Sequence, residues 1–203
     1  MIGALAKNGK PLIIDTGPIT EEELNELNNF YSDSGGGEVI VLFDVHTDKT
    51  ETMNFLGISS MIEHGFEVGY TPQGRKDWLD FMAIGLGAKI IEKRLTLSRT
   101  KPENGHWKAL EPSEFFEWMR RIKECAIALG NKQLTPTPDD LAGTTQWYKS
   151  AWLQRNVNSD DVISEEMFEY KRPGHGITSK NMQKSYIGTK FKRSYKKGDL
   201  FEG

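Results

Sequence analysis

Short apolar runs alternate with amphipathic stretches along the first two thirds of the chain. The apolar runs predict strands at 11–16, 38–45, 66–70 and 88–97, and the amphipathic stretches predict helices at 21–30, 54–63, 77–86 and 112–130. Thr20 and Glu23 have the spacing of a capping box in front of the first of these helices. A strand followed by a helix, repeated four times, predicts an α/β fold with a parallel sheet and right-handed crossovers. Such a chain forms either a small open sheet or half of a TIM barrel, and periodicity alone does not separate the two.

The character of the sequence changes after residue 130. Residues 131–145 are polar, contain two prolines and show no periodicity, which is typical of a linker. Short strand-like pieces separated by turns follow from Trp147 onward. We therefore expect a half barrel over 1–130, a linker over 131–145, and a second, small and mostly β domain over 146–203.

Composition narrows the range of partners. The 26 Lys and Arg residues against 29 Asp and Glu give a net charge of −3 without a long basic run, so we expect no nucleic-acid partner. The one cysteine, Cys125, cannot form an intramolecular disulfide. No segment reaches the roughly 20 apolar residues that cross a bilayer, and the N-terminus lacks the core of a signal peptide. We expect a cytoplasmic protein with no membrane partner.

Three polar residues alternate at the end of the second predicted strand. Asp44, His46 and Asp48 share one face if the strand continues, at the carboxyl end where barrel enzymes keep their active sites. Two carboxylates and an imidazole could bind a metal ion or orient a base, with His46 and Asp48 as the catalytic candidates. The alternative is a strand end that enters solvent, and we favour it.

Several motifs occur in a fixed order over nearly the whole chain. Their sequences are GKPLIIDTG at 9–17, LGAKIIEKRLTL at 86–97, ISEEMFEYKRPGHGI at 163–177 and YKKGDLF at 195–201. Together they resemble the sialic acid (nonulosonic acid) synthase family, also described as NeuB-like. The resemblance implies the second half of a TIM barrel, equivalent to strands five to eight, followed by an antifreeze-like (SAF) domain. The family condenses phosphoenolpyruvate with N-acetylmannosamine or a related sugar, and a divalent metal such as manganese polarises the sugar aldehyde.

The motif positions can be compared with the family one by one. The two metal-binding histidines of the family are replaced here by Gln73 and Arg94, so we expect no metal cofactor in this chain. Thr71 keeps a hydroxyl at a phosphate-contacting position, Asn54 matches an asparagine that contacts phosphoenolpyruvate, and Arg172 matches an arginine that reaches the sugar. These three are the candidate substrate-binding residues. For Arg94 itself, an ion pair with Glu92 is favoured over an anion-binding role.

The resemblance also bears on assembly. We expect that the four family strands that precede GKPLIIDTG are absent, so that the half barrel would expose strand edges and an apolar inner face. A second copy, a separate chain supplying strands one to four, or closure as an open sheet would resolve this. We expect an obligate oligomer. The chain would then be a subunit or pseudoenzyme partner of a synthase, with sugar or phosphoenolpyruvate as its ligand, and the alternative is an independent enzyme or metal-binding protein based on Asp44, His46 and Asp48.

Overall fold

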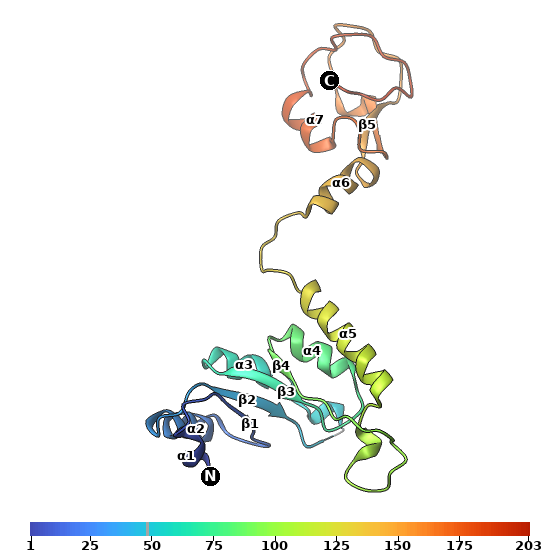
Figure 1. Cartoon of the computed structure of the whole chain (residues 1–203). Helices are drawn as coiled ribbons and strands as arrows, with labels where there is room; N and C mark the ends of the chain where they lie inside the picture. Colours follow the sequence, from blue (N-terminus) through green and yellow to red (C-terminus); the bar gives the residue numbers. More distant parts are fainter. Residues whose placement is uncertain (48) are drawn as a thin grey trace. The chain divides into compact units, whose positions relative to one another are not determined.

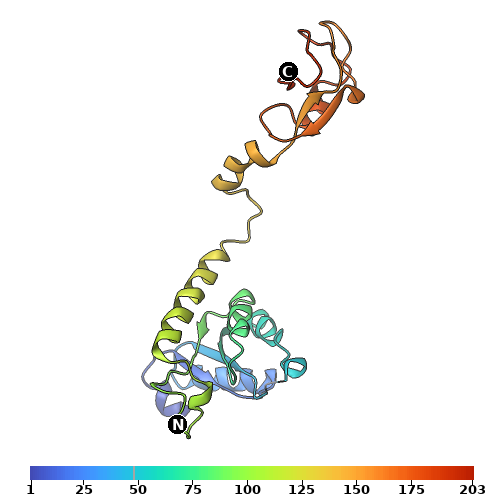
Figure 2. The same cartoon turned by 90° about the vertical axis from the view of Figure 1, so that its right-hand side faces the viewer.

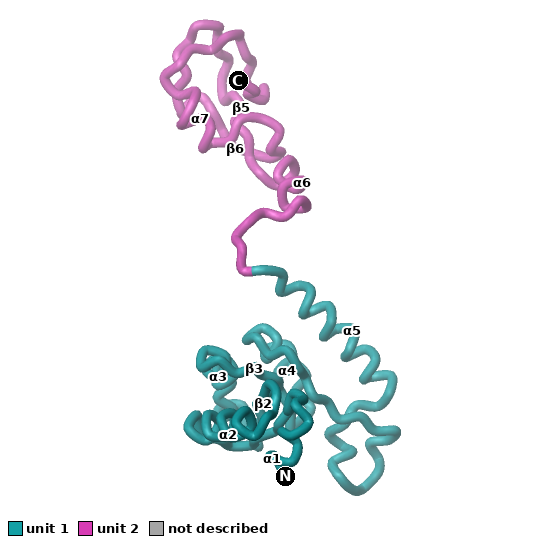
Figure 3. Tube along the Cα trace, turned by 60° about the vertical axis from the view of Figure 1, so that its left-hand side comes forward, with its two compact units in different colours: residues 1–131 teal, residues 132–203 magenta. Residues whose placement is uncertain are grey.

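The chain folds into two compact units. The computed structural model describes residues 1–47 and 49–203, and it divides into Met1–Asn131 and Lys132–Gly203 (Figure 3). Each unit has its own hydrophobic core. Among the described residues, no helix combines the length and the apolar character needed to cross a membrane.

The first unit is an α/β layer built on a parallel sheet (Figure 1). The strand order follows the sequence, β1-β2-β3-β4, which confirms the predicted parallel sheet. The strands are β1 (Leu12–Asp15), β2 (Val39–Asp44), β3 (Glu67–Thr71) and β4 (Ile90–Ile91). The helices are α1 (Ile2–Ala6), α2 (Glu21–Asp33), α3 (Gly57–Glu63), α4 (Trp78–Gly85) and α5 (Pro112–Ala128), with short 3-10 turns at Thr50–Thr52 and His106–Lys108.

Local signals explain where the helices begin. The predicted capping box of α2 is confirmed, since Glu23 N–H donates to the Thr20 hydroxyl and Thr20 N–H donates to the Glu23 carboxylate at 2.8 Å. Helix α5 begins with a second capping box from Glu111 and with a proline at its first position. This helix, the longest of the described ones, packs on α4 (Figure 2).

The core of the first unit lies between the sheet and its helices. The helices that connect the parallel strands pack on one face of the sheet, where residues of α2, α3 and α4 share a core with the strands. Alternate strand positions such as Val41 and Val68 point into this core, where they meet Leu24 of α2, Ile58 of α3 and Ala83 of α4. All five side chains are buried. The helices are therefore held by apolar packing on one side of the sheet.

The opposite face of the sheet carries no helix from the described part of this unit. In register across it lie Asp15, Leu42, Gly69 and Ile90. A Cβ atom at Gly69 would lie 2.5 Å from the Leu42 side chain, so the glycine lets Leu42 pack across its neighbour. Ile13, one row below, is 53% exposed. Alternate strand residues thus form a mostly apolar, open face opposite the helices, as they do on the inner face of a barrel.

The strand predicted at 88–97 is shorter than expected. Only Ile90–Ile91 pairs as β4, and the chain then leaves the ladder, with a single later bridge between Leu95 and Leu110. The side chains that follow still point to alternate sides of the sheet. Lys93 turns into the helix layer to meet Asp80, and Arg94 turns toward Gln73 on the open side.

The second unit is smaller and has short strands. Its two-stranded antiparallel sheet pairs β5 (Ser150–Leu153) with β6 (Phe168–Lys171), and further isolated bridges join 157 to 195 and 162 to 190. Phe201 fills its core, with ring centroids of Phe168 and Tyr186 each 5.3 Å away. Helix α7 (Ser179–Ser185) was not predicted. The assignment of this unit as an antifreeze-like domain stays a prediction.

The segment read as a linker contains a helix. Helix α6 (Pro138–Trp147) begins at a capping box in which Asp140 N–H donates to the Thr137 hydroxyl, and Pro138 occupies its first position. The Gly174 N–H donates to Thr145 O at 2.8 Å, which attaches the end of α6 to the second unit. The irregular connection is therefore shorter than the predicted 131–145.

Candidate functional site

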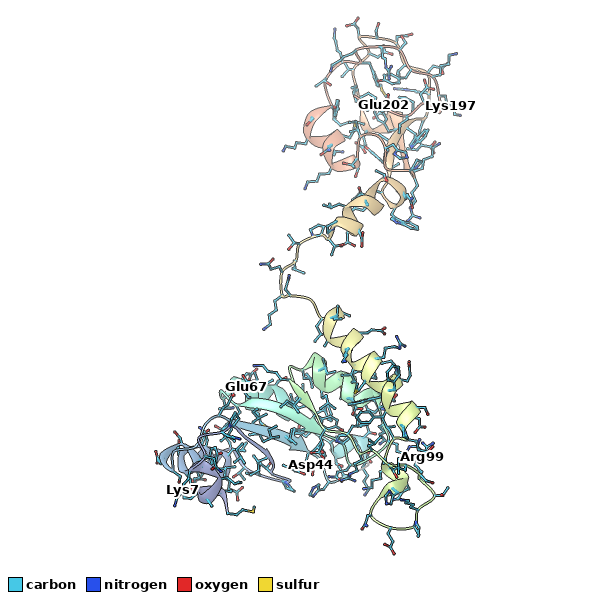
Figure 4. The ribbon with its side chains drawn as sticks, in the orientation of Figure 1. Lys7, Asp44, Glu67, Arg99, Lys197 and Glu202 are labelled. Carbon is cyan, nitrogen blue, oxygen red and sulfur yellow. The ribbon has the colours of Figure 1, made fainter. Side chains whose placement is uncertain are left out.

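Polar side chains gather where the parallel strands end. Figure 4 shows Asp44 and Glu67 at opposite ends of the sheet, and the Asp44 end is the carboxyl end of every strand. In a parallel sheet these ends share one edge, which we call the carboxyl edge. Asp44 and Thr71 are neighbours in the ladder, and Gln73 and Arg94 follow β3 and β4 at the same edge. Four of the residues singled out in the sequence therefore lie together.

Asp44 is the centre of this group. Its side chain is fully buried, and both of its oxygens accept hydrogen bonds from the Gln73 amide, at 3.0 and 2.9 Å. The His46 ring, about half exposed, forms an ion pair with Asp44 through Nε2. Burial of a carboxylate is costly unless donors surround it, and here an amide and an imidazole supply them. The structure thus joins Asp44 and His46 as the alternation suggested, whereas Asp48 lies outside the described residues.

Arg94 completes the group from the side of β4. Its Nη2 donates to Gln73 Oε1 at 3.3 Å, so that a continuous chain of contacts runs His46–Asp44–Gln73–Arg94. The expected ion pair between Arg94 and Glu92 is wrong: no such pair forms among the described residues, and Glu92 instead accepts from the Thr71 hydroxyl at 3.2 Å. Both side chains lie on the open side, as period two requires, but each has another partner there: Glu92 has Thr71 and Arg94 has Gln73.

A hollow of about 250 Å³ opens beside this chain of contacts. It is lined by His46, Thr47, Gln73 and Lys108. Gly17, after β1, approaches the same histidine, because a Cβ there would lie 3.4 Å from the His46 ring. Sequence reasoning missed Lys108. It lies on a loop after the last strand, and the only available signal was that such loops form the active face of barrel proteins.

The two positions that the sequence motifs predict to be the family's metal ligands carry residues that do not fit a metal ion. The only atom of Gln73 that could bind a cation is Oε1, and it already accepts a hydrogen bond from Arg94. The guanidinium at the second position is always cationic and would repel a metal ion. Among residues 1–47 and 49–203, no group of three His, Cys, Asp or Glu side chains is placed to hold a metal.

A buried ion pair lies behind the carboxyl edge, on the helix side. Lys93, only 5% exposed in its side chain, pairs with the fully buried Asp80, which also accepts from Trp118 Nε1 at 2.8 Å. Burial raises the pKa of Asp80, and the Lys93 ammonium opposes that rise. This pair joins α4, the segment after β4 and α5, and it fixes the backbone of the residue just before Arg94.

Asn54 lies elsewhere. It has a positive φ of 44° and lines a separate hollow of about 200 Å³ between α2 and α3, together with Ile19, Phe43 and His64. The structure thus does not bring Asn54 to the hollow lined by Gln73 and Lys108. Its proposed contact with phosphoenolpyruvate stays a prediction, as does the role of Thr71.

Arg172 belongs to the second unit and has local partners there. Its Nε donates to Trp147 O at 2.8 Å, and its guanidinium lies 5.6 Å from the Trp147 ring centroid. A cation at the last carbonyls of a helix is favourable, so this arginine caps α6. The predicted sugar contact of Arg172 is not tested by this arrangement, which engages Nε and leaves the outer nitrogens of the fork without any contact that the structure defines.

Known structures share this fold. The sialic acid synthetase from Leptospira borgpetersenii superposes with a TM-score of 0.61 at 22% identity, over 70% of this chain and 50% of that one. A spore coat polysaccharide biosynthesis protein from Bacillus subtilis gives a TM-score of 0.55 at 18% identity, over 100% and 62%. The first unit is therefore an α/β layer of the type found in sialic acid synthases.

Sequence comparison identifies the family. The NeuB family model matches residues 1–134, and the chain belongs to the NeuB family. The pseudaminic acid synthase of Campylobacter jejuni is 28% identical over 98% of this chain and 58% of its own length. The N,N'-diacetyllegionaminic acid synthase of the same organism is 25% identical over 97% and 60%. The chain thus spans about 60% of the length of these curated relatives.

Proposed function

We propose that the chain acts in nonulosonic acid biosynthesis as a subunit or pseudoenzyme partner of a synthase, and that it does not by itself catalyse the metal-dependent condensation of phosphoenolpyruvate with an amino sugar. One observation carries this proposal. Gln73 and Arg94 occupy the positions of the family's metal-binding histidines, and they are hydrogen-bonded to each other at 3.3 Å. The amide oxygen that could bind a metal ion therefore accepts a hydrogen bond from a cation instead. The relatives named as synthases support the pathway.

The open face of the sheet supports association with another chain. Ile13, Ile40 and Ile90 lie on the face that the unit's own helices leave uncovered, around Leu42, which is already buried. Ile13 is about half exposed on a strand, where an apolar side chain gains free energy when a partner covers it. The β1 and β4 edges also present backbone groups that further parallel strands could pair. We propose that another chain, either a second copy or a family member supplying barrel strands, covers this face.

The experiment is native mass spectrometry of the tagged protein recovered from its own cells, repeated with two matched variants. Ile13→Lys places a charge on the open face, and Val162→Lys places one at a residue of similar exposure in the second unit, 54% against 53%. We expect the wild type and Val162→Lys to be recovered in a complex and Ile13→Lys to be recovered alone. A wild-type chain that stays a stable monomer at micromolar concentration contradicts the proposal.

Activity is assayed on the same material. The isolated chain with manganese, phosphoenolpyruvate and N-acetylmannosamine is expected to release no phosphate above background, and a complex with a synthase chain is expected to be active. Release of phosphate by the isolated chain would overturn the pseudoenzyme assignment.

A second candidate function is an independent activity of the group around Asp44. The observation that favours it is the ion pair of His46 with a fully buried carboxylate, since such a partner fixes the ring and its tautomer. Asp48, the third member of the predicted set, lies outside the described residues. Metal analysis of the purified chain and the effect of His46→Ala on ligand binding test this candidate, and it fails if neither a metal nor an effect is found.

A further inference from the structure

Two cations lie at the carboxyl edge, one in the wall of the hollow and one next to that wall. Lys108 lines the hollow directly, and Arg94 lies behind Gln73, which forms another part of the wall. Lys108 is on the loop between β4 and α5, and Leu110 N–H donates to Arg94 O at 2.9 Å, so the loop and the arginine are tied together by the backbone. The Lys108 Nζ atom also lies 5.3 Å from the centroid of the Trp107 ring. The hollow therefore has one cation in its wall and a second, Arg94, on a neighbouring segment next to it.

Three carboxylates at this edge, all in the described part of the chain, already accept hydrogen bonds. Both oxygens of Asp44 accept from Gln73, and one of them also pairs with His46. Glu92 accepts from Thr71, and Asp15, at the end of β1, accepts from Gly17 N–H at 3.1 Å. A carboxylate with its lone pairs in use repels an incoming anion less than a free one does, because its donors offset part of the charge.

Arg94 is held in place and still has donors to offer. Gln73 Oε1 accepts from its Nη2, and a guanidinium carries five N–H groups in a planar fork. Gly105 lies over the other terminal nitrogen: a Cβ at this position would be 3.8 Å from Nη1, and the backbone φ of +70° favours glycine. The glycine thus places no side-chain atom against the guanidinium.

We propose that this hollow binds an oxyanion of a small molecule, carboxylate or phosphate, on Arg94 and Lys108 and without a divalent cation. The guanidinium fixed by Gln73 supplies the positive charge at the position where the family pattern has a metal ligand. The inference deepens the proposed function, on which it rests, by naming the ligand class and the binding mode of the same site.

The first experiment measures anion binding by isothermal titration or by NMR shifts of the backbone amides of 71–74 and 105–108, in buffer with excess EDTA. Pyruvate probes the carboxylate and inorganic phosphate probes the phosphate, so binding of one or the other identifies the chemistry. Arg94→Met and Lys108→Met are each expected to weaken binding about tenfold or more, as loss of a charge-assisted hydrogen bond does. Arg94→Lys, which keeps the charge, is expected to weaken it less.

The matched control is Arg120→Met, which removes a cation that pairs with Glu117 and Glu124 on the exposed side of α5. It is expected to leave anion affinity unchanged. Absence of binding of both probes, equal binding by wild type and the Arg94→Met and Lys108→Met variants, or an equal loss in Arg120→Met would each overturn the proposal.

The second experiment asks whether a metal takes part. Manganese binding is followed by electron paramagnetic resonance on the wild type and on the double variant Gln73→His/Arg94→His, which restores two imidazoles at the family positions. We expect the double variant to bind manganese at least about tenfold more tightly than the wild type. Tight manganese binding by the wild type, or anion binding that appears only when manganese is added, would overturn the inference. Both readouts are independent of the partner experiment, so the two proposals can fail separately.

Discussion

The buried pair of Lys93 and Asp80 gives a quantitative test of the structure around the carboxyl edge. Lys93→Met keeps an unbranched side chain, one heavy atom shorter, and removes its charge, which leaves the fully buried Asp80 with Trp118 as its remaining charge-stabilising donor. Breaking a buried pair by removing one partner costs about 3–5 kcal/mol. Because the Trp118 hydrogen bond persists, we expect about 3 kcal/mol of lost stability at pH 7.5.

The pH dependence has a definite sign. Burial already raises the pKa of Asp80, and loss of the Lys93 ammonium raises it further. An acid whose pKa is raised in the folded state contributes stability below its unfolded pKa and loses it as the pH rises through the folded pKa. The cost of Lys93→Met is therefore expected to be smaller at pH 5 than at pH 7.5, by up to about 1.4 kcal/mol for each pH unit over which Asp80 stays protonated.

The assay is hydrogen exchange of β2 and β3 peptides across a urea series, which reports the first unit separately from residues 132–203. The double variant Lys93→Met/Asp80→Asn removes both charges and keeps an acceptor for Trp118, so we expect it to lie within about 1 kcal/mol of the wild type. A single variant that costs under about 1 kcal/mol, or whose cost is equal at both pH values, would refute the reasoning.

Two further changes test the packing and the helix cap. In urea denaturation, Gly69→Ala is expected to destabilise the first unit by about 1–3 kcal/mol, since its Cβ would lie 2.8 Å from a backbone oxygen of β4. The matched variant Gly85→Ala places its Cβ in open space within α4 and is expected to be neutral or stabilising. Arg172→Met is expected to speed amide exchange at the end of α6 several-fold, because the cap on Trp147 O is lost, while Lys171→Met is expected to have no effect there. Equal stability of the two glycine variants would contradict the close packing at Gly69. Equal exchange rates in Arg172→Met and Lys171→Met would contradict the cap on α6.

The parallel sheet was predictable because its signals are local. Apolar runs of strand length with helical stretches between them placed β1, β2 and β3 close to their observed bounds, and the Thr20 capping box marked the start of α2. Helix α6 carried the same kind of signal, a threonine followed by proline and by an aspartate three residues on, but its polar composition favoured a linker. The motif was more informative than the composition.

The end of β4 could not be predicted in this way. An alternating pattern through 88–97 reads as a long strand, yet the position of Lys93 is decided by a carboxylate on α4, thirteen residues earlier in the chain. Such a pairing depends on how the elements pack together, and the apolar and polar periodicity of the sequence carries no information about that packing. The same is true of Gln73, whose amide meets Asp44 from the next strand, and of Lys108, which reaches the edge from a loop.

Gln73 and Arg94, at the positions that the sequence motifs predict to be the family's metal ligands, depend on each other for their hydrogen bonds. Without Arg94, Gln73 would still donate to Asp44 but its amide oxygen would lose its donor, and without Gln73, Arg94 would lose that acceptor and Asp44 would lose both amide hydrogen bonds. Together they satisfy each other and Asp44 in one chain of hydrogen bonds, which a site that had only lost its function would not require. A coupled replacement of this kind is expected of a site that still has to be ordered, so it favours a retained binding role at the carboxyl edge over simple decay of a metal centre.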